Sequence, residues 1–312
     1  MRVIKRKINN KLYYYLEDKY RINKKTKQFY KYLGVKKPTS KKLKEIETNF
    51  QNEIIKRLSN TNYFVEYLTK KDLIKSLLFN EQFIQKYNLL TPTKKRKYNI
   101  DSIVHFTLTT LTTEDVDVNI KDVQTAFKKR TNLSQREQIS KNMIDSVNLI
   151  HKDKSQLSLE LIKKLHKTAM SEFETKTPGL FRTKGVHILV TDKDHPLGRQ
   201  LNHRIPLHGK IIDLLKEFIE WYNTTNINPI EKSAIAHYKL YKIHPFLDGN
   251  KRICRLIFNK ALIDNKFPLV NISDKKGDYF AHLITSVEIN EPKYFIDFVY
   301  KKYLKDIKEF LK

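Results

Sequence analysis

Alternating apolar and polar residues characterise the first 36 positions of the chain, and helical spacing dominates afterwards. Three β-prone stretches rich in tyrosine, Val3–Ile8, Leu12–Glu17 and Gln28–Leu33, are separated by short polar turns. Runs with a two-residue period between turn residues are typical of strands. We therefore expect a small antiparallel β-meander, and its pattern indicates no catalytic residue.

Beyond the meander, apolar residues recur at intervals of three and four, which predicts helices. Thr39 or Ser40 is placed to cap the first helix, and Ser134 with Glu137 forms a capping-box pattern before a later one. The predicted helices cover about residues 40–60, 63–87, 134–150, 158–173, 228–242, 249–264, 276–288 and 292–311.

Two segments interrupt this helical pattern. Residues 90–98 contain two threonines, a proline and four consecutive basic residues, so we predict a linker there. It divides residues 1–97, expected to recognise a target or partner, from residues 98–312. Residues 185–206 alternate apolar and polar positions around a turn and predict an inserted β-hairpin. The expected fold class is mainly α.

The composition fits a folded chain with a strong positive charge. Apolar residues make up 40% of the sequence, which is enough for a core, and the formal net charge is +27. Such a charge can bind polyanions. However, 12 of the 61 basic residues are arginine and the rest are lysines spread along the chain among acids. Drift in composition explains this better than a dedicated surface, so nucleic acid is a candidate partner that the sequence does not favour.

The single cysteine, Cys254, excludes an intrachain disulfide and a cysteine-rich zinc module. No apolar run approaches the ~18 residues of a membrane span. The basic N-terminal stretch lacks the apolar segment of a signal peptide. We expect a soluble cytoplasmic protein with no membrane partner.

Candidate chemistry concentrates in residues 244–255, His-Pro-Phe-Leu-Asp-Gly-Asn-Lys-Arg-Ile-Cys-Arg. Asp248 and Gly249 precede an amphipathic helix, whose free amides and dipole favour an anion at its start. Gly249 also lets a phosphate approach the backbone. Arg252 and Arg255 are three residues apart on one helix face, and their forked donors suit phosphate oxygens.

Two further side chains complete this pattern. Asp248 supplies an oxygen that can hold Mg²⁺ against nucleotide phosphates. His244 lies on the preceding loop, where a neutral imidazole can take a proton from an incoming hydroxyl. Taken singly, Asp248 is as well explained as a helix cap and His244 as a structural histidine. In this order and spacing the residues predict a site for phosphate chemistry.

This segment resembles the signature of the Fic family, His-x-Phe-x-Asp/Glu-Gly-Asn-x-Arg-x-x-Arg, and it matches every fixed position. The resemblance extends over about residues 99–300. It includes Leu165-His166, Gly179-Leu180-Phe181-Arg182, Trp221 and Tyr279-Phe280. It implies a Fic-like helical core whose inserted hairpin is a flap that orients the target by strand addition.

The resemblance implies a protein adenylyltransferase that moves AMP from ATP to a Ser, Thr or Tyr hydroxyl of a target protein. His244 would be the general base, Phe246 would anchor the loop in the core, and Asp248 would bind Mg²⁺. The nucleotide-binding residues that it implies are Gly249, Asn250, Lys251, Arg252 and Arg255. A homodimer is a further candidate assembly.

One position departs from the usual pattern. Adenylyl-transferring members usually carry Gly where this chain has Lys251, and lysine there resembles the Doc branch, which acts as a protein kinase. Gly249, which Doc-like proteins replace with Ala, is retained. A Doc-like kinase and an enzyme that removes AMP are therefore alternatives, and Lys251 is equally well explained as an exposed helix lysine. An alternative of another class is a nucleic-acid-binding regulator with a vestigial Fic core.

A second pattern concerns regulation. Thr110–Asp115 resembles the inhibitory motif Ser/Thr-x-x-x-Glu-Gly/Asn of many Fic proteins, although Asp115 replaces the last residue. The match implies an inhibitory helix near residues 100–114, with Thr110 as its first fixed position. Glu114 would form an ion pair with Arg255 and displace the γ-phosphate. A surface acid at a helix start is the alternative.

Three remaining residues are expected to be structural. His237 has no third soft ligand nearby for zinc and is predicted to be a core histidine. Cys254 is predicted to be inert inside a helix. Trp221 is predicted to lie in the core.

Overall fold

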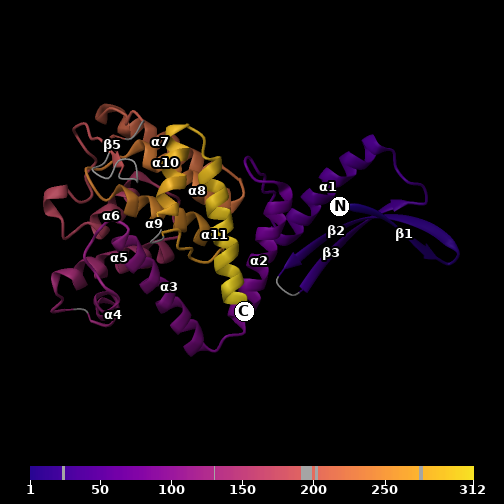
Figure 1. The fold of residues 1–312 in the computed structure, drawn as a ribbon, viewed down its shortest axis with the longest axis horizontal. Coiled ribbons are helices and arrows are strands. Elements are labelled where there is room, and N and C mark those ends of the chain that lie inside the picture. The colour runs from indigo at the N-terminus through magenta and orange to yellow at the C-terminus, as the bar shows by residue number, and fades with distance from the viewer. Residues whose placement is uncertain (23–24, 130, 191–198, 201–202, 274–276) are drawn as a thin grey trace. The chain divides into compact units, whose positions relative to one another are not determined.

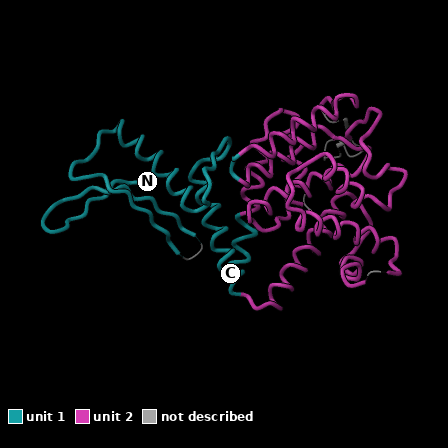
Figure 2. The backbone as a smooth tube through the Cα atoms, turned by 180° about the vertical axis from the view of Figure 1, so that it is seen from behind, with its two compact units in different colours: residues 1–89, 226–228, 304–312 teal, residues 90–225, 229–303 magenta. Residues whose placement is uncertain are grey.

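The computed structural model of the 312-residue chain describes all residues except 23–24, 130, 191–198, 201–202 and 274–276. The described backbone divides into two compact units, which Figure 2 shows in separate colours. The first contains residues 1–89, 226–228 and 304–312, and the second contains residues 90–225 and 229–303.

The first unit opens with the expected meander. Strands β1 (Arg2–Ile8), β2 (Lys11–Ile22) and β3 (Lys25–Gly34) form an antiparallel sheet in the order β1-β2-β3 (Figure 1). Asn9 and Asn10 join the first two strands with φ angles of 47° and 62°. Positive φ at both central residues is the geometry of a tight hairpin turn, and asparagine tolerates it. The prediction of a meander is confirmed.

Two helices follow, α1 (Ser40–Ser59) and α2 (Lys70–Asn88). Thr39 caps α1, as expected. The predicted start of the second helix, near residue 63, is wrong. A reciprocal capping box between Thr69 and Asp72 begins α2 at Lys70, because this pair satisfies backbone donors that have no partner within the helix.

The second unit is helical. Its helices are α3 (Pro92–Thr112), α4 (Ile120–Lys128), α5 (Gln135–Lys152), α6 (Leu159–Ala169), α7 (Ile211–Thr224), α8 (Pro229–Ile243), α9 (Asn250–Asp264), α10 (Asp278–Glu288) and most of α11 (Lys293–Leu311). The linker predicted at 90–98 is wrong. Thr91 caps α3 and Pro92 occupies its first turn, where a missing N–H costs nothing.

Helix α9 packs against α3, α5, α6 and α8 (Figure 1). Its apolar face is fully buried, and so are polar side chains that reach inward from it, including Arg255 and Asn259. Central packing therefore places the start of α9, and the loop before it, among residues from several distant segments. Trp221, expected in the core, is only half-buried on α7.

The predicted hairpin is confirmed where it is described. Strands β4 (Leu189–Val190) and β5 (Arg199–Gln200) pair antiparallel, and the turn expected at 192–198 lies outside the described residues. Among the helices that the structure describes, none has the length and hydropathy needed to cross a bilayer.

Candidate active site

The loop between α8 and α9 is held in one shape by its own side chains. His244 adopts φ 49°, an uncommon conformation for a residue with a β-carbon. The Asn250 amide accepts from the Phe246 N–H at 2.9 Å and donates to the Phe246 carbonyl at 2.9 Å. Both polar atoms of the Asn250 side chain therefore hold the loop, and a phosphate contact of Asn250 stays a prediction.

His166, which sequence reasoning noted only within the resemblance, supports this loop from α6. Its ring is stacked on Phe246 at 3.7 Å with an interplanar angle of 2°, and both residues are buried. The Gly179 N–H donates to Nδ1 at 2.8 Å, so the proton is on Nε2, which donates to the Asp248 carbonyl at 2.9 Å. Burial lowers the pKa of His166 to about 4, which keeps this neutral tautomer at pH 7.

Gly249 stands directly before α9 with φ 71°. A β-carbon at this position would lie 2.6 Å from Met170 Sδ and 3.2 Å from His166 Nε2. Both the backbone conformation and the close contact therefore require glycine. Its amide donates to Asp248 Oδ1 at 2.7 Å, so the first backbone donor of the expected anion site is engaged by the adjacent carboxylate.

The His244 side chain is arranged as a proton acceptor. Its Nδ1 lies 3.3 Å from the Tyr241 carbonyl. A carbonyl only accepts, so Nδ1 carries the proton and Nε2 keeps its lone pair. Burial lowers the pKa of His244 to about 4, which leaves the imidazole neutral at pH 7.

Arg182 ties the loop to both ends of the flap segment. Its Nε donates to the His244 carbonyl at 2.8 Å, and its backbone N–H donates to the Pro245 carbonyl at 2.9 Å. The two remaining guanidinium nitrogens donate to the carbonyls of Lys184 and Pro206, at 3.0 and 2.6 Å. This buried side chain therefore couples the position of His244 to residues flanking β4 and β5. Its place in the matched segment Gly179-Leu180-Phe181-Arg182 was the one sequence signal for it.

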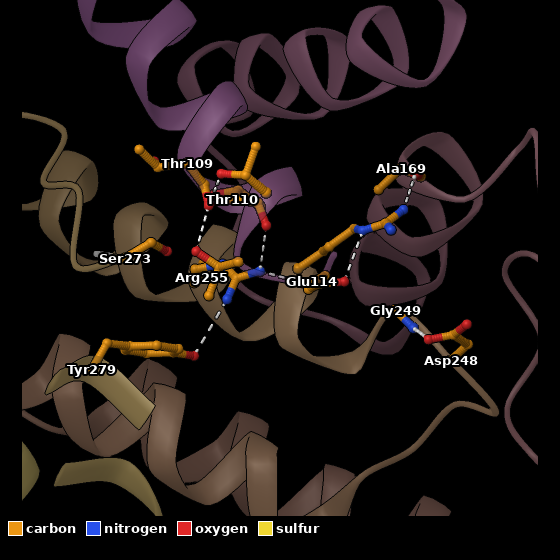
Figure 3. A network of polar contacts seen from close by, with 12 residues as sticks. Thr109, Thr110, Glu114, Ala169, Asp248, Gly249, Arg255, Ser273 and Tyr279 are labelled. Carbon is orange, nitrogen blue, oxygen red and sulfur yellow. Dashed lines mark hydrogen bonds and ion pairs between the residues drawn. The ribbon is translucent and has the colours of Figure 1, made fainter. Parts of the chain in front are cut away.

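The two motif arginines converge on Glu114, and Figure 3 shows Arg255 beside this carboxylate. Arg255 is 0% exposed, and its Nη2 forms the expected ion pair with Glu114 Oε1. Arg252 Nε donates to the other carboxylate oxygen at 3.0 Å, a contact that sequence reasoning missed. Glu114 lies two residues beyond the end of α3. The surface-acid alternative is wrong, because one carboxylate joins both guanidinium groups in the interior.

Thr110 contributes through its backbone. Its carbonyl accepts from Arg255 Nη2 at 3.1 Å, while its buried hydroxyl has no hydrogen-bond partner in the described part of the chain. On the other side, Arg255 Nη1 donates to the Tyr279 hydroxyl at 3.5 Å, which in turn contacts His237 Nε2 at 2.9 Å. His237 is fully buried, which confirms it as a core histidine.

Lys251 and Cys254 complete the first turns of α9. Lys251 is half-buried, with Nζ 4.8 Å from the centre of the Phe280 ring, and burial lowers its pKa. The exposed-lysine interpretation is therefore wrong. Cys254 is fully buried and burial raises the pKa of its thiol, as expected for an unreactive cysteine.

The donor set suits magnesium only together with phosphates. The side chain of Asp248 is 49% exposed, and its Oδ2 lies 3.6 Å from Lys176 Nζ. No cluster of three or more His, Cys, Asp or Glu side chains able to hold a metal occurs among the described residues. Mg²⁺ is commonly held by one or two carboxylates plus substrate phosphates, so Asp248 fits that role.

Comparison with known proteins gives one family. Residues 156–262 match the Fic/DOC family. Protein adenylyltransferase fic-1 of Caenorhabditis elegans is 30% identical over 139 residues, which cover 43% of this chain and 25% of that protein. Protein adenylyltransferase Fic of Drosophila erecta is 28% identical over 149 residues, covering 47% and 28%. The match thus spans about a quarter of these relatives' length.

Solved structures share the fold. A Fic-1 fragment from C. elegans aligns with a TM-score of 0.63 at 20% identity, over 88% of this chain and 78% of that one. A Fic family protein from Desulfovibrio desulfuricans aligns with a TM-score of 0.63 at 20% identity, over 80% and 77%. Because the complete motif and the family match coincide on the loop before α9, residues 156–262 form a Fic/DOC domain.

Proposed function

We propose that this chain is a protein adenylyltransferase, which moves AMP from ATP to a hydroxyl side chain of a target protein and is inhibited by its own Glu114. The observation that carries the proposal is the meeting of two buried arginines at the start of α9 beside a loop with a neutral imidazole. The relatives of the matched region are themselves named protein adenylyltransferases.

The arginines explain how a triphosphate would be held. Arg252 and Arg255 are 4% and 0% exposed, so their charges need a counter-charge within the site. Glu114 supplies it here. The β- and γ-phosphates of ATP offer the same kind of forked oxygen acceptor, and the first-turn amides of α9 favour an anion beside them. Nucleotide and Glu114 are thus alternative partners of one arginine pair, which supports autoinhibition.

His244 supplies the proton acceptor. The target hydroxyl oxygen forms a bond to the α-phosphorus, the bond from that phosphorus to the bridging oxygen of the β-phosphate breaks, and pyrophosphate leaves. The hydroxyl proton passes to His244 Nε2, whose lone pair is free because Nδ1–H faces the Tyr241 carbonyl. Mg²⁺, held by Asp248 and the phosphates, would neutralise charge on the leaving group.

The flap would place the hydroxyl. Arg182 binds carbonyls at Lys184 and Pro206, which flank the hairpin, and the carbonyl of His244. A target segment that adds to an edge of β4 or β5 by backbone hydrogen bonds would therefore be fixed relative to the base through one buried side chain.

Labelled ATP tests the proposal and separates it from the alternatives. Glu114→Gly protein is incubated with cell extract and ATP labelled at the α- or the γ-phosphate. We expect protein-bound label from α-labelled ATP, loss of that label in Glu114→Gly/His244→Ala, and retention in the matched control Glu114→Gly/His282→Ala. Label from γ-labelled ATP alone would show a Doc-like kinase, and release of AMP from labelled protein would show the reverse reaction.

A further inference from the structure

The sheet of the first unit has two different faces. Alternation along the strands places Leu16, Tyr20 and Phe29 on one face, where all three are buried. Two lysines on that side are paired with acids of the neighbouring helices: Lys27 with Glu81 at 2.6 Å and Lys31 with Glu53 at 2.6 Å. This is the helix-facing side, and acids of the helices offset these two of its cations.

The opposite side, here called the outer face, is basic. The register of β1, β2 and β3 gathers five cations on it: Arg2, Arg6, Lys11, Lys19 and Arg21. All five are exposed. Within the described strands Glu17 is the one acid of this face; it is 4% exposed and already bound by Arg2 at 2.5 Å and Lys19 at 3.2 Å. The outer face therefore carries a net charge of +4 without a partner from the helices.

The arginines of the outer face show that its charge is not explained by the high lysine content of the chain alone. The chain has 12 arginines among 61 basic residues, and three of them lie here within 21 positions. A bias toward lysine in composition does not produce arginines gathered on one face. Guanidinium groups make forked contacts to phosphates and to guanine edges in the major groove of DNA.

The tyrosines of the outer face form a fixed platform. The Arg6 guanidinium lies 4.2 Å from the Tyr30 ring centre and 5.3 Å from that of Tyr15. Tyr32 packs against Tyr15 and Tyr13, at 5.4 and 6.1 Å between ring centres. Because these rings contact Arg6 and one another, they are poorly placed to stack on the bases of a single strand.

The dimensions also match a duplex. The major groove of B-DNA is ~12 Å wide and admits a two-stranded β-ribbon, so two neighbouring strands of this sheet, ~4.8 Å apart, can enter it. Double-stranded RNA has a deep, narrow major groove that side chains cannot read. We propose that the outer face binds double-stranded DNA, with its arginines on the groove and phosphates. This is independent of the proposed AMP transfer.

Salt-dependent binding to a mixed-sequence 20-base-pair DNA duplex tests this, using the full chain and fluorescence anisotropy. Arg6, Lys11 and Arg21 are the outer-face cations not committed to Glu17, and each phosphate contact contributes about −0.9 to the log–log slope. We expect a slope of about −3, hence a loss of affinity of roughly 40-fold between 50 and 200 mM salt.

Two double variants that remove the same charge distinguish binding by the outer face from binding by the overall positive charge of the chain. Arg6→Ala/Arg21→Ala should reduce the slope to about −1. Lys5→Ala/Lys7→Ala removes the same charge from the helix-facing side of β1 and should keep the slope. Arg21→Gln alone should reduce it by about 1, which preserves the test if the double variant does not fold. Equal losses in both double variants, no binding at 50 mM salt, or tighter binding to RNA or to single strands would overturn the proposal.

Discussion

Replacing Gly249 with alanine tests how the start of α9 is built. The residue has φ 71°, and the new β-carbon would stand 2.6 Å from Met170 Sδ. The left-handed backbone costs ~1–2 kcal/mol for a residue with a β-carbon, and overpacking costs a further ~1–3 kcal/mol. We therefore expect Gly249→Ala to lower the free energy of unfolding by roughly 2–5 kcal/mol, measured by urea denaturation.

Gly277 provides the control. It also caps a helix, α10, with φ 79°, but a β-carbon there meets no atom within 4 Å. Gly277→Ala should therefore show the backbone cost alone, ~1–2 kcal/mol. Adding Met170→Ala to Gly249→Ala removes the overpacking contact and should return a coupling energy of ~1–3 kcal/mol. Equal destabilisation by Gly249→Ala and Gly277→Ala would refute the close-contact argument.

Other perturbations address the arginines, the loop and the histidines. Glu114→Gln leaves Arg255, which is fully buried, without its counter-charge. In the absence of nucleotide, the free energy of unfolding of this variant, measured in urea, should be lower by ~3 kcal/mol. Arg182→Lys keeps a charge but cannot span the three carbonyls bound by the guanidinium; kcat for AMP transfer in the Glu114→Gly background should fall about 100-fold, and unchanged kcat would contradict the positioning role. The pKa values of His166 and His244 are lowered from 6.5 to about 4 in the folded chain. Between these pH values the two histidines are protonated in the unfolded chain and neutral in the folded chain. Stability should therefore fall with pH between 6.5 and about 4, by roughly 3 kcal/mol for each histidine at ~1.4 kcal/mol per pH unit; a flat urea midpoint across this range would contradict the buried neutral assignment.

Local signals in the sequence were sufficient for many elements. Thr39 and the Ser134–Glu137 pair begin helices where predicted, because capping depends on residues within one turn. The alternation that predicted the strands and the asparagines that predicted the turn are equally local signals. The spacing from His244 to Arg255 gave the site's core, since every motif residue lies in one loop and the helix that follows it.

What the sequence missed depends on distant contacts. His166 is 82 residues from the carbonyl that it binds, and its stacking on Phe246 follows from how α6 packs on α9. Arg252 reaches Glu114 across 138 residues, and a short motif pattern does not specify which of two arginines a carboxylate contacts. The linker predicted at residues 90–98 shows the opposite case. Four basic residues and a proline indicated an irregular segment, yet Pro92 suits the first turn of α3.

The arrangement of Figure 3 also limits what can enter the site. Arg255 contacts Glu114, Thr110 and Tyr279, so its guanidinium is already bound from three directions. Under the proposed inhibition, a phosphate would take the place of the carboxylate while Thr110 and Tyr279 keep their contacts with Arg255. Because Glu114 lies just past the end of α3, we expect its release to involve this helix end.

Nucleotide affinity in Glu114→Gln gives the most direct test of the idea that this carboxylate and the terminal phosphates are alternative partners of one arginine pair. Isothermal titration calorimetry would compare ATP and AMP, with magnesium, on the intact protein and the variant. The predicted result is ATP binding tighter by roughly 5- to 150-fold in the variant, with AMP affinity unchanged because AMP lacks the terminal phosphates. Equal changes for both nucleotides, or no change for ATP, would contradict it.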